Sequence, residues 1–183
     1  MSEKLLYIVL AVTIISMLFN KKIRITKLLR EQFQVFKNAK NGNISIFDIW
    51  CFIIAPLVIS SIIVFRFDLV IDTNLANTLS VVFSIVFTIL FGFSSIIIGK
   101  IESSNDTERQ VVSETFVSII FTTILSLIGT ICSLLIISIV NEKVLKSLSL
   151  IIIYLSIISI LFLLMIIKRT YCVYEDTRFP QKK

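Results

Sequence analysis

The sequence predicts an all-α protein, a polytopic transmembrane helical bundle of four or five spans with a basic cytoplasmic amphipathic helix. Hydrophobic residues make up 56% of the 183 residues, whereas soluble domains use roughly 45 to 50%. The positive charges also fall unevenly among the segments between the apolar runs. A soluble globular fold is therefore excluded, and residues 1–183 are expected to form a single membrane domain.

Five apolar segments are candidate spans, and they cover residues 5–19, 46–65, 75–99, 116–140 and 148–167. The last four approach or exceed the ~20 residues that cross a bilayer as a helix. The first gives only about 22 Å of helix at 1.5 Å per residue, so it either spans a thinned bilayer or dips into one leaflet. We expect a retained signal-anchor helix, because Asn20-Lys21-Lys22 stands where a cleavage site would need small residues.

The loop charges predict the orientation of the spans. If residues 21–40, 100–109 and 168–183 face the cytoplasm, 14 of the 18 Lys and Arg residues lie inside and four lie outside. This is the distribution that the positive-inside rule describes. We therefore expect a bacterial inner-membrane protein with a cytoplasmic C-terminus. Its N-terminus lies in the periplasm if the first segment spans, and in the cytoplasm if it does not.

Residues 24–37 predict the basic cytoplasmic amphipathic helix, because apolar and basic positions separate onto two faces at the helical period. Such a helix could lie on the inner leaflet, where each cation gains about 1 kcal/mol from anionic lipid, or it could bind a partner. The tail, residues 168–183, adds further cations, so the cytoplasmic face carries a formal net charge of about +7. Membrane lipids and a soluble cytoplasmic protein are the expected partners. The candidate partner or lipid surface comprises Arg24, Lys27, Arg30, Lys37, Lys168 and Arg169.

Local signals mark how two spans begin. Ser45 and Asp48 have the spacing of a capping box before the second span, and Pro56 is expected to kink that span. Thr107 to Gln110 has similar spacing, so the fourth helix should begin several residues before its apolar run. This arrangement would expose an acidic cytoplasmic loop that contains Glu102, Asp106, Glu108 and Glu114.

Small and hydroxyl residues recur every three or four positions in two spans, which is typical of helix packing or oligomer interfaces in bilayers. We expect the two sets either to face each other in one chain, or to include a subunit interface of a homo-oligomer, or to line a narrow pore. The third-span stripe comprises Ser80, Ser84, Thr88 and Gly92, and the fourth-span stripe comprises Ser118, Thr122, Ser126 and Gly129.

The residue census argues against an enzyme. The chain contains no histidine, so the commonest general base and metal ligand are missing. Nucleophile motifs, phosphate-binding glycine loops and metal-ligand spacings are also absent from the sequence. Apart from Asp48 at the start of the second segment, the apolar runs contain no charged residue, which argues against an ion-coupled transporter. We therefore expect no catalytic residues, no cofactor and no metal.

In its layout the chain resembles the membrane subunit of the Kiwa bacterial anti-phage system. The resemblance is carried by the chain length, the series of spans, the basic segment from Lys21 to Lys40 and the Lys168-Arg169 pair that ends the last span. It implies an oligomeric membrane scaffold that recruits a soluble DNA-binding partner and responds to infection. It also implies four spans, one fewer than the five apolar segments.

We therefore expect a non-enzymatic inner-membrane scaffold or sensor subunit that oligomerises and recruits a soluble cytoplasmic partner, with a role in antiviral defence if the resemblance holds. Direct nucleic-acid binding by this chain is not expected. Two alternatives remain open, a small pore-forming effector or channel and a bacteriocin-immunity-like membrane protein. A scaffold should co-purify with a soluble protein encoded beside it, whereas a pore should depolarise cells when expressed alone.

Overall fold

The computed structural model describes residues 25–36, 45–103, 106–139 and 141–178, with side chains placed for 26–36, 45–99, 109–139 and 141–172. This part of the chain is helical and contains no strand, which confirms the predicted all-α class. The predicted first span, residues 5–19, lies outside the described residues. The elements are α2 (Ile25–Val35), α3 (Ile46–Ile49), the π-helical turn η1 (Trp50–Ile54), α4 (Ala55–Arg66), α5 (Thr73–Ser103), α6 (Asp106–Ser138) and α7 (Glu142–Arg178).

Within the described residues, 4 helical stretches are long and apolar enough to cross a membrane: Ile46–Arg66, Thr73–Gly99, Arg109–Ser138 and Glu142–Cys172. They coincide with the last four predicted spans. Large apolar side chains such as Ile89, Ile131 and Leu164 are exposed along these helices, while the hydroxyl side chains of Ser118, Thr122 and Ser126 are buried. An apolar exterior of this extent requires lipid around it. The chain is therefore a multi-pass membrane protein.

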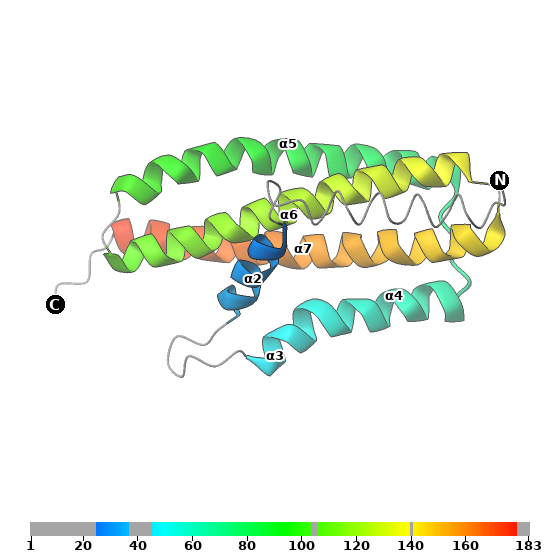
Figure 1. Ribbon diagram of the computed structural model, residues 1–183, viewed down its shortest axis with the longest axis horizontal. Coiled ribbons are helices and arrows are strands. Elements are labelled where there is room, and N and C mark those ends of the chain that lie inside the picture. The colour runs from blue at the N-terminus through cyan, green and yellow to red at the C-terminus, as the bar shows by residue number, and fades with distance from the viewer. Residues whose placement is uncertain (1–24, 37–44, 104–105, 140, 179–183) are drawn as a thin grey trace.

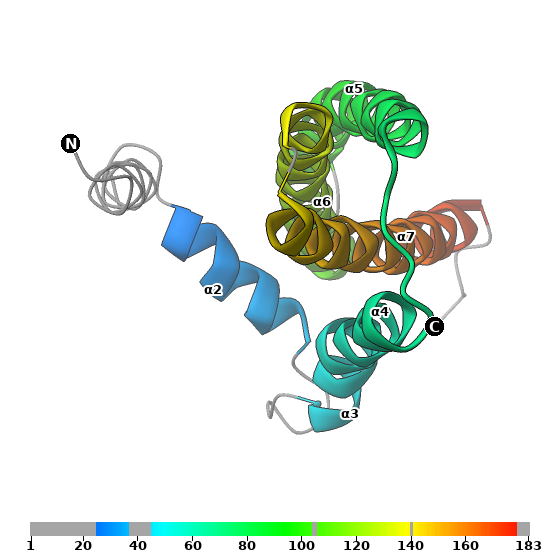
Figure 2. The ribbon, with the colours of Figure 1, turned by 90° about the vertical axis from the view of Figure 1, so that its right-hand side faces the viewer.

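Helices α5, α6 and α7 form the body of the bundle, and α4 packs on α7 outside it (Figure 1). Seen along the bundle, α6 lies between α5 and α7 (Figure 2). One core cluster contains Phe83, Ile136 and Ile152, and a second contains Leu90, Ile119 and Ile166, so both join residues of all three helices. The α4 helix buries only small or modest side chains, namely Pro56, Ser60 and Val64.

The span that contains α3, η1 and α4 begins as its sequence predicts, and a π-helical turn precedes its proline. The hydroxyl of Ser45 accepts a hydrogen bond from the backbone N–H of Asp48 at 3.3 Å, which is the predicted cap. A π-helical turn at Trp50–Ile54 comes directly before Pro56, and the Ala55 N–H donates to the carbonyl of Trp50. Because a proline ring clashes with the carbonyl four residues earlier in a regular helix, the wider turn accommodates Pro56 within one continuous span.

The connection between α4 and α5 is fixed to the start of α7. Lys146 pairs with Asp68 at 2.8 Å, and the N–H of the fully buried Ile71 donates to the Ser149 hydroxyl at 3.0 Å. Asp68 has a positive φ of 51°, which an aspartate tolerates better than most residues. These contacts align the end of α4 with the beginning of α7.

The predicted amphipathic helix is present as α2, but it packs against the protein at its C-terminal end. Phe36 lies 5.5 Å from Phe52 and 6.2 Å from Phe162, measured between ring centroids. Leu29 and Phe33, which the sequence assigns to the same apolar face, remain 39% and 41% exposed. The sequence left open whether this helix lies on the membrane surface or binds a partner. The structure adds that the end of the helix is attached to α6 and α7.

A cavity remains beneath α2, and one polar side chain in it has no partner. Gln32 is 3% exposed, and neither atom of its amide group has a hydrogen-bond partner within the described residues. It lines a cavity of about 160 Å³ together with aromatic side chains that include Phe121 and Tyr154. Burying an unpaired amide is costly, so α2 is held less firmly than the α5–α7 body.

Candidate functional site

The fourth-span stripe lies inside the bundle. Ser118, Thr122 and Ser126 are fully buried, and each hydroxyl donates to the carbonyl four residues earlier, at 2.7 to 3.0 Å. Gly129 faces the ring of Phe83, and a Cβ added to Gly129 would lie 2.8 Å from Phe83 Cζ. This stripe therefore lets α5 and α6 approach closely, with the Phe83 ring occupying the space that a side chain at residue 129 would need.

The third-span stripe lies on the opposite side of α5. Ser84, Thr88 and Gly92 are exposed and Ser80 is half-buried, and, apart from the local backbone of α5 itself, no described atom lies within 4 Å of a Cβ built on Gly92. The expectation that the two stripes face each other within one chain is therefore wrong. The reason is that Phe83, Leu90 and Ile97 turn the large face of α5 toward α6 and α7. The third-span stripe faces the lipid or another subunit.

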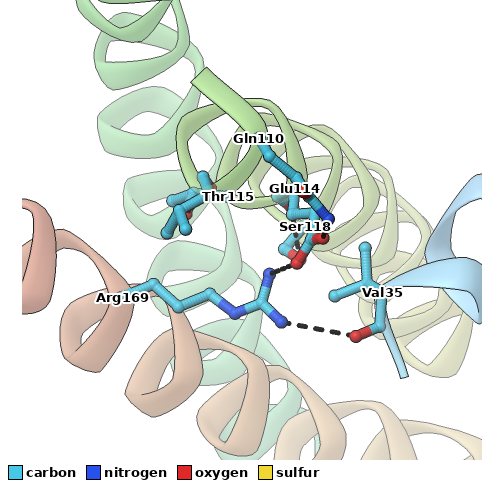
Figure 3. Close-up of polar contacts among 7 residues, drawn as sticks. Val35, Gln110, Glu114, Thr115, Ser118 and Arg169 are labelled. Atoms are coloured by element: carbon cyan, nitrogen blue, oxygen red, sulfur yellow. Dashed lines mark hydrogen bonds and ion pairs between the residues drawn. The ribbon is translucent and has the colours of Figure 1, made fainter. Parts of the chain in front are cut away.

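An ion pair and a hydrogen bond join α6, α7 and the C-terminal end of α2 (Figure 3). Arg169 of α7 donates from Nη1 to Glu114 Oε2 of α6 at 3.1 Å and from Nη2 to the carbonyl of Val35 at 3.4 Å. The Gln110 amide donates to the other Glu114 oxygen at 3.2 Å. The side chains of Arg169 and Glu114 are 21% and 34% exposed. We call this arrangement the Arg169 clamp.

The Arg169 clamp corrects two assignments made from the sequence. Glu114 does not belong to an acidic loop, because it lies within α6, and Arg169 is not a free surface cation. The two residues are 55 positions apart, so no local pattern links them. The sequence did contain a signal for this pair. Glu114 lies just before the apolar run 116–140, and Arg169 lies just after the run 148–167. Because consecutive spans are antiparallel, these two positions come to lie side by side.

The remaining residues of the candidate partner or lipid surface divide into two groups. Lys27, Arg30 and Lys168 are exposed, and Lys27 makes a 3.5 Å ion pair with Glu31 on the same helix. Arg24 and Lys37 lie outside the described residues. The exposed cations come from α2 and α7, which the Arg169 clamp connects. They therefore belong to two helices that contact each other in the folded chain.

Among the side chains that the structure places, no group of three or more Cys, Asp or Glu residues could hold a metal ion. Cys51, Cys132 and Cys172 are free thiols. No family model, curated protein or solved structure matches this chain.

Proposed function

We propose that the protein is a non-enzymatic scaffold or sensor subunit of the bacterial inner membrane that oligomerises and recruits a soluble cytoplasmic partner. The observation that carries this proposal is the position of α2. The helix contacts α6, its Val35 carbonyl accepts from Arg169 of α7, and its Lys27 and Arg30 side chains are exposed. Its basic residues are thus presented by a folded element instead of a free segment.

Charge distribution supports a cytoplasmic partner. The segments 21–40, 100–109 and 168–183 hold 14 of the 18 cations, and the positive-inside rule assigns these segments to the cytoplasm. An excess of positive charge attracts an acidic protein surface and raises the rate of encounter. The partner that fits this surface is therefore a soluble protein with an acidic patch.

The exposed third-span stripe supports oligomerisation. Small residues at four-residue spacing let two helices approach closely inside a bilayer, where no hydrophobic effect holds helices together. Ser84, Thr88 and Gly92 of this stripe are exposed, and no neighbouring described residue lies within 4 Å of a Cβ built at Gly92. We assign it to contacts between copies of this chain. The layout resemblance to the Kiwa membrane subunit favours the same combination of oligomer and recruited partner, and with it a role in anti-phage defence.

The experiment is a co-purification with the soluble protein encoded beside this chain in its genome. Reversal of two charges, Lys27→Glu with Arg30→Glu, should reduce recovery of that protein about tenfold or more, the change that 1.4 kcal/mol gives. Recovery with the unaltered chain should fall as salt rises, because the screening length is only about 3 Å at 1 M ionic strength.

The matched control is Lys143→Glu, which changes an exposed cation at the opposite end of the bundle. It should leave recovery unchanged. Equal recovery by the α2 variant and the wild-type protein at every salt concentration would overturn the proposed recruitment. Depolarisation of cells that express this chain alone would favour the pore-forming alternative instead.

A further inference from the structure

A groove of about 500 Å³ separates α7 from α3 and η1, a volume within the roughly 300 to 1,000 Å³ of small-molecule sites. Most of its wall is apolar, and its charged residues come from two different helices. It lies beside the Arg169 clamp, because Val35 and Arg169 belong to both. The lining residues that matter here are Asp48, Phe52, Leu161, Leu164, Lys168 and Arg169.

The part of the groove wall that α7 contributes changes from apolar to charged along the helix. Leu161 and Leu164 line one part of the groove, and Lys168 and Arg169 line the part that follows toward the C-terminus. At 1.5 Å per residue, Leu161 and Lys168 are about 10 Å apart along the helix axis. Because the C-terminal end of α7 is the end expected in the cytoplasm, the groove is apolar toward the bilayer centre and charged toward the membrane surface. A phospholipid of the inner leaflet has the same polarity.

Three charged residues line the groove, namely Asp48, Lys168 and Arg169, and one of them is already paired. Arg169 is compensated by Glu114 at 3.1 Å, so it adds little net charge. Neither Lys168 nor Asp48 makes an ion pair with another described residue. The groove therefore offers one uncompensated ammonium group and one uncompensated carboxylate, which differs from the purely basic pockets that suit anionic headgroups.

We propose that this groove binds one phospholipid with a phosphoethanolamine headgroup. The lipid phosphate accepts from Lys168, the primary ammonium donates to Asp48, and an acyl chain lies along Leu161, Leu164 and Phe52. Phosphocholine has no N–H to donate to Asp48, and phosphoglycerol has no cation to place there. Charge-assisted hydrogen bonds are stronger than neutral ones, so Asp48 selects the headgroup while Lys168 holds any phosphate. This inference does not depend on the proposed soluble partner.

The experiment is native mass spectrometry of the full-length chain released from detergent micelles, with dioleoyl phosphatidylethanolamine, phosphatidylcholine and phosphatidylglycerol added in turn. The wild-type protein should bind one phosphatidylethanolamine molecule about tenfold more tightly than either of the other lipids, a difference typical of one charged hydrogen bond. Three variants then assign the contacts, and each should retain wild-type helicity by circular dichroism.

The Asp48→Asn variant should bind phosphatidylethanolamine and phosphatidylcholine equally. Its cap is unaffected, because the Ser45 hydroxyl accepts from the backbone N–H of residue 48. The Lys168→Gln variant should bind all three lipids more weakly. The control Lys143→Gln, which alters an exposed cation at the other end of the bundle, should match the wild-type protein.

The proposal is overturned if wild-type protein binds phosphatidylcholine as tightly as phosphatidylethanolamine, or if phosphatidylglycerol binds most tightly. This comparison uses only unaltered protein, so a variant that fails to fold does not rescue the proposal. A headgroup preference that persists in Asp48→Asn also overturns it.

Discussion

Gly129 and Gly92 occupy stripes of similar composition but opposite surroundings. The ring of Phe83 leaves no room for a Cβ at residue 129, whereas the space around residue 92 is open. The sequence could predict both stripes, because hydroxyl and glycine residues recur at helical spacing. It could not predict which stripe faces inward, because that depends on Phe83, whose ring fits against a residue of another helix.

Two matched substitutions test this difference. Gly129→Leu should lower the stability of the detergent-solubilised protein by about 1 to 3 kcal/mol, the usual cost of overpacking a filled interior. A Cβ at residue 92 meets no neighbour among the described residues, and leucine has a higher helix propensity than glycine, so the melting temperature of Gly92→Leu should stay at or above the wild-type value. Thermal unfolding followed by circular dichroism provides the measurement.

The same pair of variants separates folding from assembly. Gly92→Leu should shift the protein to a smaller species in size-exclusion chromatography with light scattering, since a bulky side chain blocks close approach at the third-span stripe. If Gly92→Leu keeps both the wild-type size and the wild-type melting temperature, that stripe faces lipid and does not form a subunit contact.

At the scale of elements, α2 is the helix whose attachment depends on a few contacts. Its C-terminal carbonyl at Val35 accepts from Arg169, Phe36 enters an aromatic cluster, and the Gln32 amide is buried without a described partner. The amphipathic pattern predicted a helix here correctly. The attachment could not be predicted, because it depends on Arg169, 134 residues from Val35.

Removal of the Arg169 clamp should loosen α2. Arg169→Gln leaves Glu114 without its cation and the Val35 carbonyl without its donor, and at these partly exposed sites we expect a cost of about 1 kcal/mol. Hydrogen–deuterium exchange should therefore accelerate in residues 25–36 while α5 remains protected. Glu114→Gln keeps the bond to Val35 and should have a smaller effect. Unchanged exchange in α2 of the Arg169 variant would show that the aromatic contacts alone hold the helix.

At the scale of the whole molecule, the four described spans follow directly from apolar length, because the bilayer sets how many apolar residues a helix needs. Local signals also gave the start of α3 at Ser45 and the early start of α6 at Asp106. The packing of α4 against α7 could not be predicted from the sequence. It depends on contacts such as Ile71 with Ser149, which join residues 78 positions apart.

The topology can be tested with reporter fusions. Fusions after Lys40, Glu108 and Lys183 should report a cytoplasmic location, and fusions after Asp72 and Lys143 should report a periplasmic one, because the cations are concentrated in the first set of segments. An alkaline phosphatase and green fluorescent protein pair reads the two compartments independently. A periplasmic signal after Lys183 would reverse the orientation on which the proposed partner surface depends.

The unequal lengths of α7 and the α3–α4 span determine how far the bundle stands above the lipid. Ile46–Arg66 has 21 residues and α7 has 37, a difference of about 24 Å of helix at 1.5 Å per residue. Lys146 and Asp68 join the two helices near one end, so most of the excess extends past the other. The backbone of the last turns of α7 therefore stands farther from the end of the α3–α4 span than the screening length of about 8 Å at physiological salt.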